Sequence, residues 1–173
     1  MTTLICGGSK CGKSALAEKI LDGVCEQKFY IATMQPYGEE AFCAIERHRR
    51  IRNEKNFETI EKYRDLEEIS LPNGCAILLE CLGNLLANEM FCEYTSKNIA
   101  DKIISGLIHL KNFSSELVIV SSIVDCDGIE YSPETTKYCQ ILAEINSRAA
   151  EFSDNVIECV YGIPITLKGR AIC

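Results

Sequence analysis

Several features that define other protein classes are scarce in this sequence. Basic residues are in the minority, because 18 Lys and Arg against 25 Asp and Glu give a formal net charge of −7 and a pI near 5.0. Nucleic-acid binders usually need a basic face, so this composition argues against one. No apolar run approaches the ~20 residues needed to span a bilayer, and Met1–Thr3 leads into an apolar segment without a basic region or cleavage site. We expect a cytoplasmic protein with no membrane span and no nucleic-acid partner.

Metal-binding spacings and linkers are also missing. None of the 11 cysteines forms a Cys-x-x-Cys pair, and the two histidines, His48 and His109, lie far from any ligand-like spacing of cysteines. Since the chain carries no secretion signal, we interpret the cysteines as reduced thiols. No linker, repeat or low-complexity tract divides the 173 residues. The sequence therefore predicts a single domain over residues 1–173.

Short apolar runs alternate with longer segments of helical periodicity. This alternation is typical of βα units around a mostly parallel sheet flanked by helices. The predicted strands are Thr3–Cys6, Lys28–Thr33, Cys75–Glu80, Leu117–Ser121 and Val156–Val160, with a possible last strand at Ile163–Leu167. The predicted helices are Lys13–Leu21, Glu39–Arg52, Leu82–Tyr94, Ile99–Leu110 and Glu134–Phe152. The fold class is therefore α/β.

A phosphate-binding motif stands between the first predicted strand and the first predicted helix. It fits G-x-x-x-x-G-K-[ST] and consists of Gly7, Gly8, Ser9, Lys10, Cys11, Gly12, Lys13 and Ser14. Its glycines let backbone N–H groups surround phosphate oxygens, Lys13 reaches the β and γ phosphates, and Ser14 can bind Mg²⁺. The alternative is a glycine-rich turn that only connects strand to helix. Spacing and context together favour the phosphate loop (P-loop).

An acidic residue is needed at the end of a neighbouring strand to fix the Mg²⁺ of a P-loop site. Glu80 follows four apolar residues, Ala76–Leu79, and so stands at the end of a strand, where ligands of open α/β sheets bind. An ordinary polar strand terminus is the alternative. We predict a Mg²⁺ site that involves Ser14 and Glu80.

The segment Glu46–Arg52 is the only dense basic run in the chain. Its simplest interpretation is a solvated helix face. Helical spacing, however, places His48 and Arg52 on one face, where an imidazole could meet a phosphate held by a guanidinium. Neutral imidazole is a competent nucleophile, so His48 could carry a nucleotidyl group. His109 stands among apolar residues and is predicted to be a surface or packing residue.

The sequence resembles the family of bifunctional adenosylcobinamide kinases and adenosylcobinamide-phosphate guanylyltransferases of cobalamin biosynthesis. Six motifs of that family occur here in order. They are the P-loop, Tyr30–Thr33, the H-R-x-x-R segment within Ala44–Arg52, Phe57–Glu61, Leu78–Asn88 and Gly162–Lys168. The resemblance covers nearly the whole chain and implies a P-loop NTPase fold of the RecA-like type.

The resemblance implies two reactions at one nucleotide site. Adenosylcobinamide is phosphorylated from ATP or GTP, and GMP is then passed from GTP to adenosylcobinamide phosphate through a guanylylated histidine, here His48. Lys13 would join His48 as a catalytic residue. The residues that would hold nucleotide beside the P-loop are Ile31, Ala32, Thr33, Arg49, Arg50, Ile51, Arg52, Glu61 and Glu80. Members of the family are similar in forming homotrimers, which we also expect here.

The chain departs from the family pattern at a few positions. Ser122 and Ile123 replace an amide and a carboxylate that usually follow the fourth predicted strand, which puts the kinase reaction in question, and Gly83 stands where Thr or Ser is common. Two other functions are alternatives to the bifunctional enzyme. A single-function small-molecule kinase would form no covalent adduct, and a GTP-dependent switch would need an N-K-x-D motif, which the sequence lacks.

Overall fold

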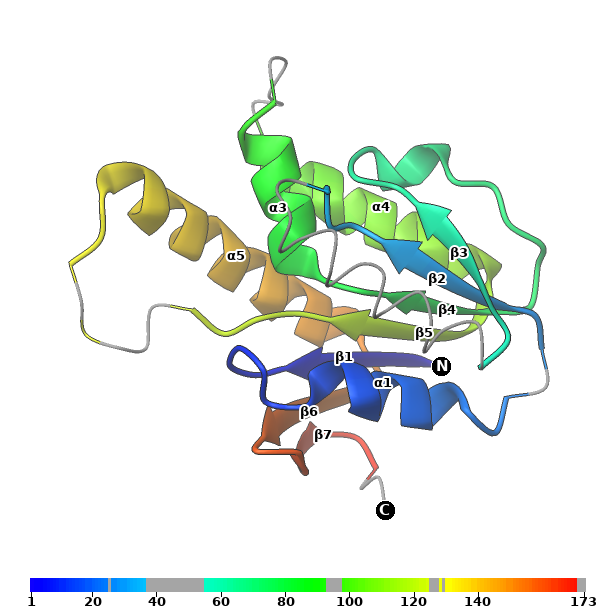
Figure 1. Ribbon diagram of the computed structural model, residues 1–173. Coiled ribbons are helices and arrows are strands. Elements are labelled where there is room, and N and C mark those ends of the chain that lie inside the picture. The colour runs from blue at the N-terminus through cyan, green and yellow to red at the C-terminus, as the bar shows by residue number, and fades with distance from the viewer. Residues whose placement is uncertain (25, 37–54, 93–97, 125–127, 129, 171–173) are drawn as a thin grey trace.

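One sheet of seven strands forms the centre of the protein. The computed structural model describes residues 1–24, 26–36, 55–92, 98–124, 128 and 130–170. The strand order is β3-β2-β4-β5-β1-β6-β7, and only the pairing of β7 with β6 is antiparallel (Figure 1). The strands are β1 (Thr2–Cys6), β2 (Lys28–Ala32), β3 (Phe57–Glu61), β4 (Cys75–Leu79), β5 (Ser114–Val120), β6 (Asn155–Val160) and β7 (Ile163–Lys168).

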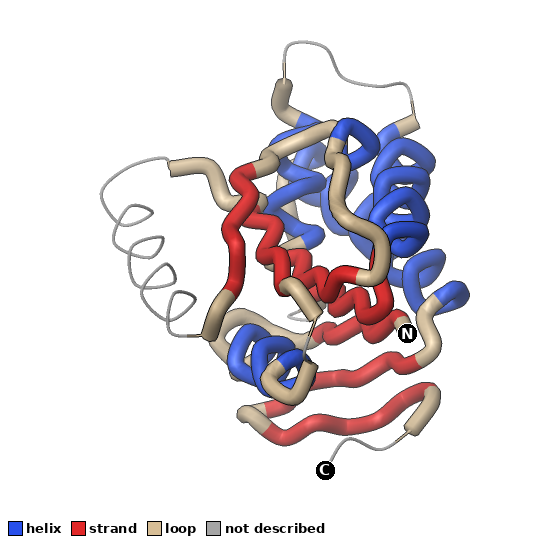
Figure 2. Tube along the Cα trace, turned by 90° about the vertical axis from the view of Figure 1, so that its right-hand side faces the viewer, coloured by secondary structure: helices blue, strands red, loops and turns tan. Residues whose placement is uncertain are grey.

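Helices cover both faces of this sheet. They are α1 (Lys13–Leu21), α3 (Leu82–Met90), α4 (Ile99–Phe113) and α5 (Pro133–Phe152), with a short 3₁₀ helix, η1 (Leu66–Glu68). Among the described helices, α1 lies on one face in the view of Figure 2, and α3, α4 and α5 lie on the other. Side-chain N-caps fix the starts of α4 and α5, because Asn98 and Ser132 each accept a hydrogen bond from the backbone N–H three residues later. No helix of the described residues is long and apolar enough to cross a membrane.

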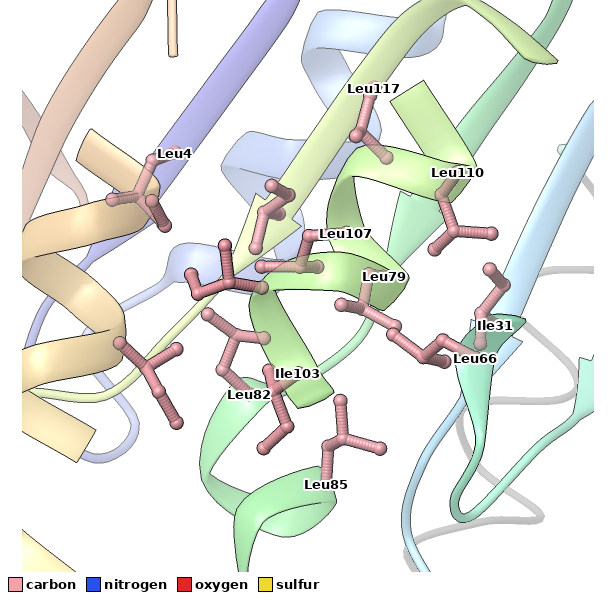
Figure 3. Close-up of a cluster of buried hydrophobic side chains, with 14 of the residues drawn as sticks. Leu4, Ile31, Leu66, Leu79, Leu82, Leu85, Ile103, Leu107, Leu110 and Leu117 are labelled. Atoms are coloured by element: carbon pink, nitrogen blue, oxygen red, sulfur yellow. The ribbon is translucent and has the colours of Figure 1, made fainter. Parts of the chain in front are cut away.

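The core consists of two layers, one on each face of the sheet. Alternation along β1 sends Leu4 to the layer under α3–α5 and Ile5 to the layer under α1. The larger layer includes Leu79, Leu82 and Leu107, all fully buried (Figure 3). Each such side chain contributes roughly 1.5–3 kcal/mol to stability. Both faces of the sheet are therefore buried over its central strands, as the near-continuous apolar runs predict.

The predicted α/β fold, a mostly parallel sheet flanked by helices, is confirmed, with small differences in the elements. The segment Phe57–Glu61, in which the apolar pattern predicts no strand, forms an edge strand. Strand β5 begins at Ser114 rather than Leu117, because α4 continues to Phe113 and the chain turns at once into the sheet. The predicted helix Glu39–Arg52 lies outside the described residues.

The carboxyl ends of the parallel strands meet at one edge of the sheet. Backbone hydrogen bonds continue one residue beyond several strands: Glu80 N donates to Ile31 O at 3.1 Å and Ser121 N donates to Ile5 O at 2.8 Å. On the far side, Ala32 pairs with Glu61. The register thus brings Glu80, Ala32 and Glu61 into one row at this edge.

Candidate functional site

The loop Gly7–Ser14 leaves the carboxyl end of β1 and places a buried ammonium at its centre. Lys13 is the first residue of α1, and its side chain is only 9% exposed. Its Nζ donates to the carbonyl oxygens of Gly7 at 2.9 Å and Gly8 at 2.5 Å. A lysine is rarely buried without such partners. The loop therefore holds one positive charge in the position where the motif requires a phosphate contact.

The backbone of the loop turns in a way that few residues allow. Gly12 has φ 101° and serves as the N-cap of α1, and the first helical hydrogen bond runs from Leu16 N to Gly12 O at 3.1 Å. The first turn of α1 carries no acidic side chain, and Ser14 is half-buried within it. The positive end of the helix and its free N–H groups are thus available to an anion.

A hairpin from the other end of the chain supports the loop from behind. Between β6 and β7, Gly162 N donates to Cys11 O at 2.7 Å, and the Cys159 thiol donates to the same oxygen at 3.2 Å. A Cβ atom at Gly12 would lie 3.2 Å from Gly162 Cα. Sequence reasoning predicted a possible strand at Ile163–Leu167 and a family motif at Gly162–Lys168, but it missed the contact of this segment with the loop.

The tight fit of Gly7 against this hairpin gives a stability prediction. A Cβ at Gly7 would lie 2.5 Å from Cys159 O, whereas a Cβ at Gly8 would meet nothing within 4 Å. We expect Gly7→Ala to lower the free energy of unfolding by about 2 kcal/mol, because β1 or β6 must shift. Gly8→Ala is the matched control and should unfold like the wild type. Equal stability of the two variants in urea titrations would contradict the packing described.

The thiols beneath the loop are held in the neutral form. Burial raises the pKa of Cys6 to about 11, and the nearby Glu158 carboxylate adds to the rise while Lys13 opposes it. Burial also raises the pKa of Cys159, as does its hydrogen bond with Cys11. At neutral pH neither Cys6 nor Cys159 therefore carries a charge. The Lys13 ammonium is not neutralised by these two groups and remains available to phosphate.

Glu80 lies across one strand from the loop. Strand β5 separates β4 from β1, so the two strands are about 10 Å apart at ordinary strand spacing. Glu80 is 9% exposed, and alternation along β4 puts it on the α1 side, with Ala76 and Leu78. A carboxylate and the Ser14 hydroxyl are the hard oxygen ligands that Mg²⁺ prefers.

A cation between Ser14 and Glu80 would need further ligands from a bound nucleotide. The described residues contain no group of three or more His, Cys, Asp and Glu side chains that could hold a metal ion. Mg²⁺ commonly keeps several waters and binds through one or two carboxylates and substrate phosphates. Ser14 and Glu80 fit a Mg²⁺ of that kind, arriving with a nucleotide.

The ends of β2 and β3 carry four of the other predicted nucleotide contacts. Ile31 and Thr33 are both fully buried, and Thr33 Oγ1 donates to Cys81 O at 2.9 Å. Ala32 is 8% exposed. Glu61, in contrast, is exposed, and its carboxylate accepts a hydrogen bond from the Tyr63 hydroxyl at 2.9 Å. Of this group, Glu61 is therefore the side chain most accessible to a ligand.

Two neighbouring residues of α3 hold this edge together, and no sequence pattern singled them out. The Asn88 side-chain amide donates to Thr33 O at 2.8 Å and to Tyr63 O at 3.0 Å. Glu89, which is 2% exposed, accepts from Asp65 N at 2.9 Å and pairs with Lys102 at 2.6 Å. Helix α3 thus ties together the chain segments that follow β2 and β3.

The predicted site residues His48, Arg49, Arg50, Ile51 and Arg52 lie outside the described residues.

The prediction for the second histidine is confirmed. His109 is half-buried, its Nε2 lies 2.8 Å from Ile69 O, and its ring packs edge-on against Phe113 at 5.0 Å. His109 is therefore a packing residue on α4.

The segment that departs from the family pattern adjoins the P-loop. Ile123 N donates to Gly7 O at 3.1 Å, and the Ile123 side chain is 37% exposed. Asn146 of α5 fixes the residues before it, accepting from Ser121 Oγ at 2.5 Å and donating to Ser122 O at 3.1 Å. The altered positions are thus next to the phosphate site and are held by a hydrogen-bonded clamp.

The absence of a side chain at Gly83 has a structural explanation. A Cβ at this position would lie 2.8 Å from the Tyr138 hydroxyl oxygen of α5. Burial raises the pKa of Tyr138 to about 12, so this hydroxyl stays protonated. Gly83 therefore leaves the space that the Tyr138 side chain occupies between α3 and α5.

Solved structures of similar shape were found at low sequence identity. A structure titled as a structural study of PH0250 from Pyrococcus horikoshii OT3 is 8% identical, covers 98% of this chain and 87% of its own, and has a TM-score of 0.54. The P4 protein from bacteriophage phi6 in complex with ADP is 13% identical, covers 98% of this chain and 56% of its own, and has a TM-score of 0.46. The first supports the fold alone.

Sequence comparison is more specific. The chain is 26% identical over 176 residues to the bifunctional adenosylcobalamin biosynthesis protein CobP of Pseudomonas aeruginosa, and the match covers 99% of this chain and 100% of that protein. The family profile CobU, described as cobinamide kinase / cobinamide phosphate guanyltransferase, matches residues 3–167. The chain therefore belongs to the cobinamide kinase / cobinamide phosphate guanyltransferase family.

Proposed function

We propose that the protein phosphorylates adenosylcobinamide and then transfers GMP from GTP to adenosylcobinamide phosphate, as part of cobalamin biosynthesis. The observation that carries the proposal is the buried Lys13 ammonium inside the Gly7–Ser14 loop, in a chain of this family. Nucleotide binding by phosphate follows from that geometry. The description of the family supports the two reactions, and the relative that is named as a bifunctional adenosylcobalamin biosynthesis protein supports the pathway.

In the kinase reaction, the chain neutralises and orients phosphate. The loop N–H groups and Lys13 would hold the β and γ phosphates of ATP or GTP while the corrinoid hydroxyl attacks the γ phosphorus in line. The bond from the γ phosphorus to the bridging oxygen breaks, the hydroxyl proton is lost, and ADP or GDP leaves. Ser14 and Glu80 would hold Mg²⁺, which neutralises the charge that develops on the phosphate oxygens. No covalent bond to the protein is needed for this step.

In the guanylyl transfer, we assign the nucleophile to His48. A neutral imidazole nitrogen attacks the α phosphorus of GTP, an N–P bond forms, and the bond to pyrophosphate breaks. An oxygen of adenosylcobinamide phosphate then attacks the same phosphorus, the N–P bond breaks, and adenosylcobinamide-GDP leaves. Arg49, Arg50 and Arg52 stand beside His48 in the sequence and would neutralise the phosphates.

The test of this proposal uses GTP labelled on the α phosphate. We expect the wild-type protein to acquire label that is stable in base and labile in acid, as a phosphorus–nitrogen bond to histidine requires. Addition of adenosylcobinamide phosphate should release the label into adenosylcobinamide-GDP. A protein that phosphorylates adenosylcobinamide but never becomes labelled would instead be a single-function kinase, and the guanylyl-histidine proposal would be wrong.

Other properties stay predictions that rest on the resemblance. We expect a homotrimer, Mg²⁺ as the cation and a cytoplasmic location. The molar mass in solution checks the first, because three chains of 19.3 kDa should elute together. Loss of both reactions in EDTA and their recovery with Mg²⁺ check the second.

A further inference from the structure

The P-loop binds phosphates, and the nucleobase needs a separate contact. Sheet order places β5 and β4, with Glu80, on one side of β1, and β6 and β7 on the other. Lys13, Ser14 and Glu80 gather the terminal phosphates and Mg²⁺ toward the β4 side. With the phosphates held in this way, the ribose and base would extend from the loop toward the opposite side, where the β6–β7 hairpin lies beside α1 (Figure 1).

The turn of that hairpin touches the phosphate loop. It consists of Tyr161 and Gly162, between the paired residues Val160 and Ile163. Gly162 N donates to Cys11 O at 2.7 Å, and its Cα would lie 3.2 Å from a Cβ at Gly12. Tyr161 is thus the sequence neighbour of a residue that contacts the Gly7–Ser14 loop directly. At 93% exposure, it is more open to solvent than any other large apolar side chain of the described residues.

The backbone at this turn disfavours tyrosine. Tyr161 has φ 50° and Gly162 has φ 82°, and a two-residue hairpin loop with positive φ at both positions is a type I′ turn. Asn, Asp or Gly is strongly preferred at the first position, and a bulky residue with positive φ is an outlier. Since the ring is exposed, packing inside the protein does not compensate for this strain. Backbone strain that no packing within the protein offsets is typical of functional sites, so it points to a binding role for Tyr161.

We infer that Tyr161 is the platform on which the purine of the bound nucleotide stacks. The inference rests on the proposed function, because it needs a nucleotide whose phosphates occupy the Gly7–Ser14 loop. Stacking of an aromatic ring on a base tolerates any purine, since every base has a π face. Tyr161 would therefore serve ATP and GTP alike.

The experiment compares three substitutions at Tyr161 with two ligands. Tyr161→Ala removes the ring, Tyr161→Phe keeps it, and Tyr161→Asn replaces it with a residue that suits a type I′ turn. Calorimetry measures the affinity for GTP and for inorganic tripolyphosphate, which has phosphates but no base. Ile163→Ala is the matched control, because Ile163 is also exposed, at 65%, on the same hairpin.

We expect Tyr161→Ala and Tyr161→Asn to weaken GTP binding by about 10-fold, while tripolyphosphate affinity and the Tyr161→Phe variant stay near the wild type. Tyr161→Asn should at the same time raise Tm by about 2 °C, because it relieves the backbone strain. A variant that is more stable but binds GTP less tightly cannot be explained by damage to the fold. Ile163→Ala should bind both ligands normally.

Three results would overturn the inference. They are unchanged GTP affinity in Tyr161→Ala, equal losses of GTP and tripolyphosphate affinity, and a change in oligomeric state without a change in affinity. Its failure is distinct from failure of the proposed function. If GTP binds in a Tyr161-dependent way but no protein-bound GMP forms, the stacking platform stands and the guanylyl transfer proposal falls.

Discussion

Lys13→Ala is expected to abolish both phosphoryl transfer and guanylyl transfer, with kcat/KM for each lower by about 1,000-fold. The reason is that one ammonium, only 9% exposed and held by the carbonyls of Gly7 and Gly8, serves the phosphates of every nucleotide that enters the loop. In a site with little water, loss of that charge removes stabilisation of the transition state that solvent cannot restore.

The measurement is steady-state kinetics of both reactions, together with urea unfolding of each variant. Lys13→Met preserves much of the side-chain volume without its charge, so it separates catalysis from packing. Lys19→Ala is the control, because Lys19 is an exposed cation in the last turn of the same helix. Near-normal rates in a folded Lys13→Met protein would show that the Gly7–Ser14 loop is not the phosphate site.

His48→Ala should separate the two reactions. We expect it to lose all protein-bound label from α-labelled GTP and all synthesis of adenosylcobinamide-GDP, because alanine offers no nitrogen to attack phosphorus. Phosphorylation of adenosylcobinamide should keep most of its rate, since we assign in-line transfer to a hydroxyl to Lys13, Ser14, Glu80 and Mg²⁺, without a covalent intermediate. One substitution would thus remove one activity and spare the other.

His109→Ala is the matched control for this experiment. Its ring packs against Phe113 on α4, so its loss should lower stability slightly and change neither reaction. His48→Asn tests whether a hydrogen-bonding group alone can replace the imidazole, and we expect no label there either. If His48→Ala still became labelled, the nucleophile would be another residue.

The sequence predicted the part of the site that depends on neighbouring residues. The Gly7–Ser14 motif fixes a loop whose chemistry is local, and the structure shows Lys13 buried in it. The position of Glu80 directly after β4 was also predictable, since four apolar residues followed by a carboxylate indicate a strand end. Both predictions needed only short windows of sequence and the general geometry of parallel sheets.

The remaining features depend on contacts that no short window contains. Strand β3 lies at the edge of the sheet and carries Glu58 and Glu61. Because these residues are polar, a search for apolar runs does not identify the strand. The support of Cys11 by Gly162 joins residues from opposite ends of the chain. The backbone angle of Tyr161 likewise gave no signal, because tyrosine is not a turn residue.

The position of β1 has a consequence for synthesis of the protein. Strand β1, near the start of the chain, pairs with β5 and β6, so Thr3 has Val118 and Asn155 as its neighbours. A growing chain must therefore extend beyond β6 before its first strand can complete both ladders, and until then Leu4 and Ile5 remain exposed to other chains on the ribosome. Long-range pairing of this kind folds slowly. The phosphate loop, which follows β1, would be among the last parts to form, so nucleotide binding would report that the chain has folded through β6.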